Sequence, residues 1–277
     1  MKESCAQFGQ DRHLAGIVSE PAATPRRVAC LLVNAGLVPK YGPFRLYASL
    51  ARRLAGEGFR TLRFDLGGIG DSRQEYASLP LRERTQLEIG EAVEHLSSLP
   101  DVDGVVLGGL CSGAEDSFRY AENDERVRGV VLIDPFSYRT PGWRWRHLRH
   151  RVARRSMRVL GVFQPLAPPA NAAPTGEPKV RALVNYKYME HSESSRILRT
   201  LLDRKARAHF VYTGGMHETF NHEGQLADMF EGIDFGGLVT IDHFPRADHT
   251  QPLEEDRRML IDAIVGRLAS AYPTATP

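Results

Sequence analysis

The chain has few cysteines and no long apolar segment. Only three of its 277 residues are cysteine: Cys5, Cys30 and Cys111. So small and odd a number argues against a disulfide framework and fits a reducing compartment. No stretch approaches the roughly 18 apolar residues of a membrane-spanning helix, and the start "MKESCAQFGQDRH" lacks the apolar core of a secretory signal. We therefore expect a cytoplasmic protein without a membrane span.

The sequence also lacks the signatures of nucleic-acid, nucleotide and metal binding. The formal net charge is only +2, which gives no reason to expect a nucleic-acid partner. The glycine-rich stretches "GGIG" and "GLCSG" do not have the GxGxxG or GxxxxGK[ST] spacing of phosphate-binding loops. The histidines of "HETFNHE" do not form an HExxH arrangement, and no other cluster has metal-ligand spacing. The sequence predicts neither a metal nor a cofactor.

What the chain does have is a regular alternation of apolar runs and helical patterns. The run "VACLLVNAG" is continuously apolar, which is typical of a strand buried on both faces. From this run to the end of the chain, strands of this kind alternate with amphipathic helices, and two short strands are expected earlier, between Phe8 and Pro21. This order predicts a three-layer α/β domain with a mostly parallel sheet of about eight strands. The first two strands would add an antiparallel edge.

One long segment, residues 136–196, interrupts the alternation. Between Pro135 and Gly176 there is no Asp or Glu, but there are eight Arg and two His. Its Arg-rich first half can form a helix, whereas its Pro- and Ala-rich second half is typical of a loop. We therefore expect a core domain of residues 1–135 and 197–277, with residues 136–196 inserted into it as a basic lid.

The stretch "GGLCSG" carries the most specific motif. Gly109, Cys111 and Gly113 fit the frame G-x-nucleophile-x-G, between an expected strand and an expected helix. A tight turn of this kind exposes the nucleophile, and small residues on either side let strand and helix approach each other. If the frame were centred on Ser112, Leu110 and Ala114 would occupy the two positions where strand and helix approach each other. Cys111 is therefore the predicted nucleophile. The alternative is an inert buried thiol, which is what we expect for Cys30 in its apolar strand.

Taken together, these features resemble the α/β-hydrolase superfamily, and most closely its serine-aminopeptidase or thioesterase-like branch with a lid. Here a cysteine replaces the nucleophilic serine. Four stretches follow the superfamily's order, namely "NAG", "RFDLGGIGDS", "GLCSG" and "RADHT". The resemblance covers nearly the whole chain except the inserted segment, and it implies the α/β-hydrolase fold. It also implies a catalytic histidine in the last stretch, at His249, with His243 as the closest rival.

The acid of the implied triad is the least defined member. The superfamily usually supplies it after the seventh strand, where "TGGMHET" lies, and Glu218 is the candidate there. A shift of two residues would put Met216 in that place and leave the usual acid missing. Asp134, at the end of the sixth strand, is an alternative acid. A Cys–His pair can also work with a weak orienting group, because a thiol is already fairly acidic.

The resemblance further implies an oxyanion hole made of two backbone N–H groups. One follows the nucleophile, at Ser112, and the other lies in the loop after the third strand, at Leu37. Asn34 ends that strand with a polar side chain, which either contacts the substrate or organises the loop.

This set of residues predicts acyl transfer. Cys111 would attack an ester or thioester, with His249 acting first as base and then as acid, and the acyl-cysteine would pass to water or to another acceptor. An acyl-cysteine is itself a thioester, so exchange with a thioester substrate costs little free energy. We therefore expect an acyltransferase or thioesterase. The alternatives are a hydrolase of small esters or lactones and a non-catalytic member that uses the fold as a binding module.

The arginines of the insert suggest a partner. Arg144, Arg146 and Arg149 are predicted to bind the phosphate of coenzyme A, or a phosphopantetheine-bearing acidic acyl carrier protein. The alternatives are an ordinary solvated basic face and a membrane-surface contact.

Overall fold

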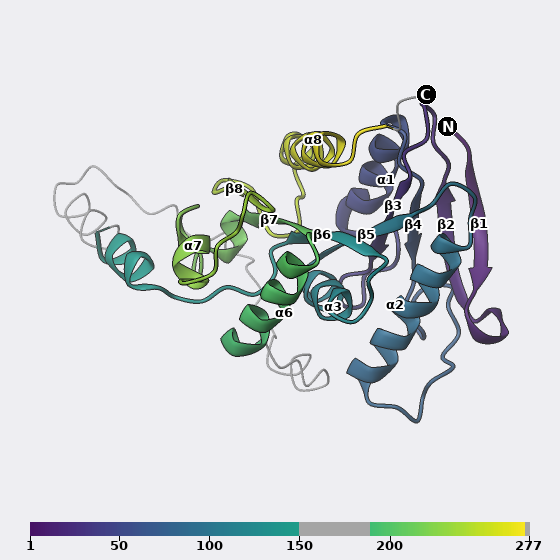
Figure 1. The fold of residues 1–277 in the computed structure, drawn as a ribbon, viewed down its shortest axis with the longest axis horizontal. Coiled ribbons are helices and arrows are strands. Elements are labelled where there is room, and N and C mark those ends of the chain that lie inside the picture. The colour runs from purple at the N-terminus through teal and green to yellow at the C-terminus, as the bar shows by residue number, and fades with distance from the viewer. Residues whose placement is uncertain (150–188, 275–277) are drawn as a thin grey trace, which may run out of the picture.

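The computed structural model describes residues 1–149 and 189–274, which form one eight-stranded sheet covered by helices on both faces (Figure 1). The strand order is β1-β2-β4-β3-β5-β6-β7-β8, in which β3 to β8 run parallel while β1 and β2 pair antiparallel at one edge. The predicted three-layer fold with its antiparallel edge is confirmed. The strands are β1 (Glu3–Phe8), β2 (Leu14–Ser19), β3 (Val28–Val33), β4 (Thr61–Phe64), β5 (Gly104–Leu110), β6 (Val127–Ile133), β7 (Arg207–Thr213) and β8 (Val239–Phe244).

Helices α1 and α8 pack together on one face of the sheet, and α2, α3 and α6 cover the opposite face (Figure 1). None of the helices in the described ranges is long and apolar enough to cross a membrane. The helices are α1 (Leu46–Gly56), α2 (Leu81–Ser97), α3 (Ser112–Ala121), α6 (His191–Asp203), α7 (Gln225–Met229) and α8 (Glu254–Ala271), and residues 141–149 are also helical.

The alternation of side chains along each central strand explains its continuous apolar run. In β3, Leu31 and Val33 belong to the core under α2 and α3, whereas Cys30 and Leu32 belong to the core under α1 and α8. Because both faces are covered, both sets of side chains must be apolar.

The first strand begins earlier than expected. The sequence pattern predicts two strands between Phe8 and Pro21, but β1 already starts at Glu3. Most β1 side chains are exposed or half-buried, because the strand lies at the edge of the sheet. An edge strand does not need a repeating apolar pattern, so its start is not visible in the sequence.

The expected lid is described only at its two ends. Residues 141–149 form its first helix, and residues 150–188 lie outside the described residues. Helix α6 begins at His191, so the expected boundary at residue 196 falls inside a helix that packs on α3.

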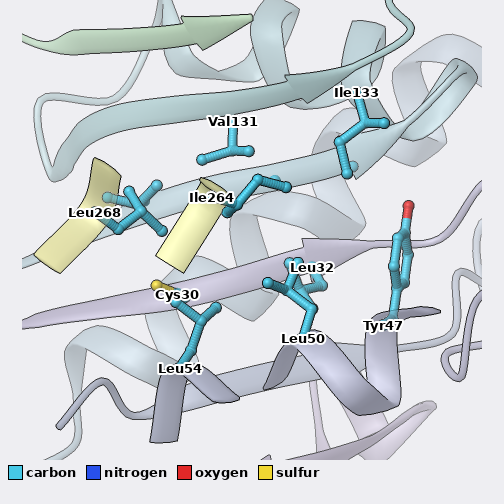
Figure 2. A pocket seen from close by; sticks show the side chains of 12 residues that line it. Cys30, Leu32, Tyr47, Leu50, Leu54, Val131, Ile133, Ile264 and Leu268 are labelled. Atoms are coloured by element: carbon cyan, nitrogen blue, oxygen red, sulfur yellow. The ribbon is translucent and has the colours of Figure 1, made fainter. Parts of the chain in front are cut away.

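A small apolar cavity of about 10 Å³ lies between the sheet and helices α1 and α8 (Figure 2). The Cys30 side chain borders it together with Leu32 and Leu54. Burial raises the pKa of the Cys30 thiol to about 12. Cys30 is therefore a buried, protonated thiol, in line with the prediction from its apolar strand.

Candidate active site

Cys111 occupies the sharp turn between β5 and α3. Its backbone has φ 56° and ψ −118°, which is a strained conformation for a residue with a Cβ atom. The Cys111 N–H donates to the Ile133 carbonyl of β6 at 2.9 Å, which holds the turn against the next strand. The side chain is exposed. The turn therefore presents the Cys111 thiol to solvent at the carboxyl ends of the parallel strands.

The two flanking glycines make this turn possible. A Cβ atom on Gly109 would lie 2.3 Å from the backbone carbon of Gly113, and one on Gly113 would lie 2.5 Å from the Val33 carbonyl oxygen. A Cβ atom does not approach non-bonded atoms this closely in proteins, so neither position tolerates a side chain without backbone movement. The two positions that must be free of a side chain, Gly109 and Gly113, are those of the frame centred on Cys111.

His249 and Asp134 lie beside the turn and contact each other. His249 follows β8, and its Nδ1 atom lies 2.8 Å from Asp134 Oδ2. Asp134 follows β6 and is buried, and its carboxylate also accepts hydrogen bonds from the Thr213 N–H and hydroxyl, each at 2.6 Å. These hydrogen bonds fix the orientation of the Asp134 carboxylate, and the carboxylate in turn orients the His249 imidazole.

The histidine also contacts the cysteine. The hydrogen bond to Asp134 and a second one to Cys111 raise the pKa of His249 to about 10, against the opposing effect of burial. The raised pKa favours the doubly protonated ring at neutral pH. Asp134, His249 and Cys111 therefore lie in one continuous chain of contacts.

Glu218, the expected acid, is not the carboxylate that contacts His249. Its side chain is exposed, and its backbone carbonyl accepts a hydrogen bond from Arg139 Nε at 3.0 Å. The alternative acid, Asp134, orients His249 instead. The rival histidine, His243, packs edge-on against Phe220. The sequence feature that points to Asp134 is its position directly after the apolar run of β6. This strand pairs with β5, which ends just before Cys111.

The loop after β3 reaches the turn through a glycine. The Gly36 N–H donates to Ser112 Oγ at 2.7 Å, so the contact with the turn begins one residue before the expected Leu37. A Cβ on Gly36 would meet nothing within 4 Å, which leaves open space beside this amide. Leu37 follows with an exposed side chain.

Asn34 organises this loop. It is buried, and its Nδ2 donates to the Gly36 and Val38 carbonyls at 3.4 and 3.3 Å. Its Oδ1 accepts from the Leu66 N–H at 3.3 Å. Of its two expected roles, the contacts fit the organisation of the loop.

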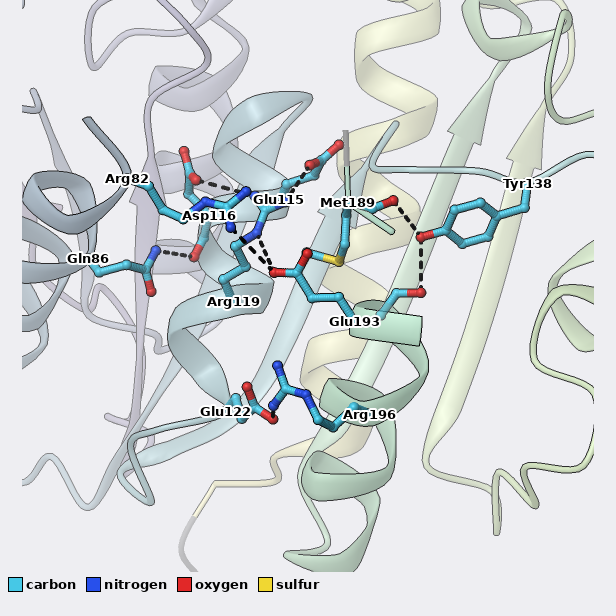
Figure 3. Close-up of polar contacts among 11 residues, drawn as sticks. Arg82, Gln86, Glu115, Asp116, Arg119, Glu122, Tyr138, Met189, Glu193 and Arg196 are labelled. Atoms are coloured by element: carbon cyan, nitrogen blue, oxygen red, sulfur yellow. Dashed lines mark hydrogen bonds and ion pairs between the residues drawn. The ribbon is translucent and has the colours of Figure 1, made fainter. Parts of the chain in front are cut away.

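A network of charges holds α3 against α6 (Figure 3). Arg119 is buried and contacts Glu115 Oε2 at 3.3 Å and Glu193 Oε1 at 3.0 Å. Nearby, the Tyr138 hydroxyl donates to the Met189 carbonyl at 2.9 Å, which joins the two described ends of the expected lid. These contacts hold α3, the helix that begins directly after Cys111, against α6.

The three arginines of the expected lid lie on the helix of residues 141–149. Arg144, Arg146 and Arg149 are all exposed on residues 141–149. Arg146 and Arg149 line an open groove of about 870 Å³ together with His222, and Cys111 is not part of its lining. Within residues 1–149 and 189–274, no group of three or more His, Cys, Asp or Glu side chains is arranged to hold a metal ion.

Comparison with known proteins finds similarity in solved structures. No protein-family model and no curated protein matches the chain. DcsB, solved in complex with its substrate analogue, is 18% identical with a TM-score of 0.60, over 97% of this chain and 99% of that one. The α/β hydrolase GrgF from Penicillium sp. sh18 is 17% identical with a TM-score of 0.59, over 98% and 99% of the two chains. XC6422 from Xanthomonas campestris, an α/β serine hydrolase without lid, is 15% identical with a TM-score of 0.61, over 100% and 97%.

Proposed function

We propose that this protein, which has the α/β-hydrolase fold, is an acyltransferase or thioesterase that uses Cys111 as its nucleophile. The observation that carries the proposal is the contact chain from Asp134 through His249 to Cys111, at a turn that exposes the thiol. A positioned nucleophile, a base and a group that orients the base are the parts that covalent acyl transfer requires.

In the first step, the Cys111 sulfur attacks the carbonyl carbon of an ester or thioester. A C–S bond forms, and the carbonyl π electrons move onto oxygen. We propose that the Ser112 N–H and the Leu37 N–H stabilise this oxyanion, Leu37 following the Gly36 whose N–H donates to Ser112 Oγ. When the tetrahedral intermediate collapses, the leaving alcohol or thiol takes a proton from the His249 imidazolium.

In the second step, His249 acts as base. Acylation removes the Cys111 partner that helps to raise the pKa of His249, so the pKa falls and the neutral ring is favoured. The neutral imidazole accepts a proton from water, an alcohol, an amine or a thiol as that group attacks the acyl-cysteine. Asp134 keeps its hydrogen bond to Nδ1 throughout and stabilises the imidazolium when it re-forms.

The choice of sulfur favours activated acyl donors. Exchange between an acyl-cysteine and a thioester replaces one C–S bond with another, so the step is close to balanced in free energy. We infer that the donor is a thioester, with the acceptor deciding between hydrolysis and transfer.

Arg144, Arg146 and Arg149 are proposed to dock the phosphate of coenzyme A or of carrier-bound phosphopantetheine. Their exposure and the open groove beside Arg146 and Arg149 support this role. Changing the three arginines to glutamate should raise the KM for a coenzyme A thioester about tenfold or more, because three favourable charges become unfavourable. The KM for the matching N-acetylcysteamine thioester, which has no phosphate, should stay within about twofold. Equal effects on both donors would contradict docking. The matched control is Arg199→Glu, which changes an exposed arginine of α6.

Thiol labelling tests the assignment of the nucleophile. At near-neutral pH, Cys111 should react with iodoacetamide faster than Cys5 or Cys30, because His249 beside it stabilises the thiolate. His249→Ala should slow the labelling of Cys111 and leave that of Cys5 unchanged. Peptide mass spectrometry measures all three sites, and equal reactivity of Cys111 and Cys5 would argue against an activated thiol.

A further inference from the structure

Exposed apolar side chains gather on the segment that passes the nucleophile. Leu37, Tyr41 and Phe44 are 72, 49 and 57% exposed. Isolated exposed apolar residues are common on protein surfaces, but three within one short loop beside a reactive thiol are not expected by chance.

Both ends of this segment contact the residues that flank Cys111. At its start, the Gly36 N–H donates to Ser112 Oγ at 2.7 Å. At its end, the buried Tyr47 hydroxyl accepts a hydrogen bond from the Leu110 N–H at 2.7 Å. The segment therefore starts and ends beside the residues that flank Cys111.

From Gly36 to Phe44 the segment presents mainly apolar side chains, and the exposed Arg45 follows them. Lys40 is the only charged residue between positions 36 and 44. Its ammonium lies 2.6 Å from Asp65 Oδ2 and 2.5 Å from Asp71 Oδ2, and its backbone N–H also donates to Asp65. These contacts hold the charge against the loop after β4 and leave the apolar side chains facing solvent.

The backbone of the segment is strained where it presents Phe44. Phe44 and Arg45 have φ angles of 45° and 64°, which cost free energy for residues with a Cβ atom. In the free protein this strain is not offset by burial of the phenyl ring, which stays 57% exposed. An acyl chain packed against the ring would bury part of this apolar surface.

A second apolar side chain follows the catalytic histidine. Leu253 is 65% exposed and immediately precedes α8, just as Phe44 lies just before α1. These two helices pack side by side (Figure 1). Both begin at the edge of the sheet that carries Cys111, so Leu253 extends the apolar surface on the His249 side.

We propose that Leu37, Tyr41, Phe44 and Leu253 form an apolar rim that binds the acyl chain of the substrate, and that the preferred donors carry a medium or long hydrocarbon chain. This inference rests on the proposed function, since it concerns the group that Cys111 takes up. The occupant is an acyl chain because hydrogen bonds at both ends of the segment join it to the neighbours of Cys111, and the one charged side chain between Gly36 and Phe44 is paired.

Chain-length dependence tests the rim. The probes are acetyl and octanoyl N-acetylcysteamine thioesters, which differ only in the hydrocarbon. A rim that covers the chain should make kcat/KM for octanoyl about tenfold or more higher than for acetyl, since each buried CH₂ contributes up to about fourfold. Phe44→Ser combined with Leu253→Ser should lower this preference about tenfold. Leu87→Ser, which removes an exposed leucine from α2, is the matched control and should leave the preference unchanged.

The outcomes separate the rim from the proposed function. The rim would be overturned, and the function left intact, if Cys111 were acylated with equal kcat/KM by both thioesters. The same would follow if the double variant kept the preference for octanoyl. A change of oligomeric state in the double variant, with the preference unchanged, would assign the surface to a second copy of the chain and also overturn the proposal. Absence of any acyl adduct on Cys111 would instead contradict the function itself.

Discussion

Replacing Cys111 by alanine is expected to abolish acyl transfer, with a loss in kcat of at least about 10³-fold, because the covalent intermediate can no longer form. Cys111→Ser should keep the exposed position but leave only a small fraction of the activity. Its hydroxyl is far less acidic than a thiol, so the nucleophile is no longer an anion near neutral pH and its attack depends on proton removal by His249. Turnover of an acyl thioester measures both variants.

The control for this result is the other exposed cysteine. Cys5 lies on the edge strand β1, and Cys5→Ala should leave turnover within about twofold of the unchanged protein. If Cys111→Ala retained turnover, the nucleophile would have to be another group, and the acyl-cysteine mechanism would be wrong.

The second large effect is expected at Asp134. Asp134→Asn should lower kcat about 10²- to 10⁴-fold, because an amide cannot stabilise the imidazolium and can select the wrong tautomer of His249. The hydrogen bond to Asp134 is the largest cause of the raised pKa of His249, so its loss lowers that pKa below about 10. The imidazolium then loses its proton at lower pH, and the alkaline limb of the pH–rate profile should move to lower pH.

Glu218 is the matched comparison for Asp134. Glu218→Gln makes the same chemical change at the position that superfamily order suggests, but on an exposed side chain. It should leave kcat within about twofold and the pH–rate profile in place. A large loss at Glu218 with a small one at Asp134 would reverse the assignment of the acid.

The fold could be predicted because its determinants are local. The apolar run of β3 is visible in the sequence since both faces of the strand are buried, and the steric frame around Cys111 follows from Gly109 and Gly113 alone. Cys111 and His249, the proposed nucleophile and base, are both predicted from such local stretches.

The acid and the oxyanion loop depend on spatial relations that the sequence does not carry. Asp134 meets His249 across 115 positions of the chain, and only the pairing of β6 with both β5 and β7 brings it there. In the loop after β3, the contact with Ser112 falls on Gly36 because Asn34 folds the backbone back on itself. A shift of one residue in such a loop depends on these side-chain contacts, which no spacing rule contains.

Time-resolved intact-mass spectrometry with an octanoyl thioester tests the central claim most directly. We predict that the mass of one octanoyl group appears on the protein, that peptide mapping places it on Cys111, and that it accumulates in His249→Ala if acylation still proceeds but deacylation is slowed. It should disappear when the true acceptor is supplied. Turnover of the thioester without any adduct on Cys111, under conditions that trap acyl-enzymes, would contradict the account.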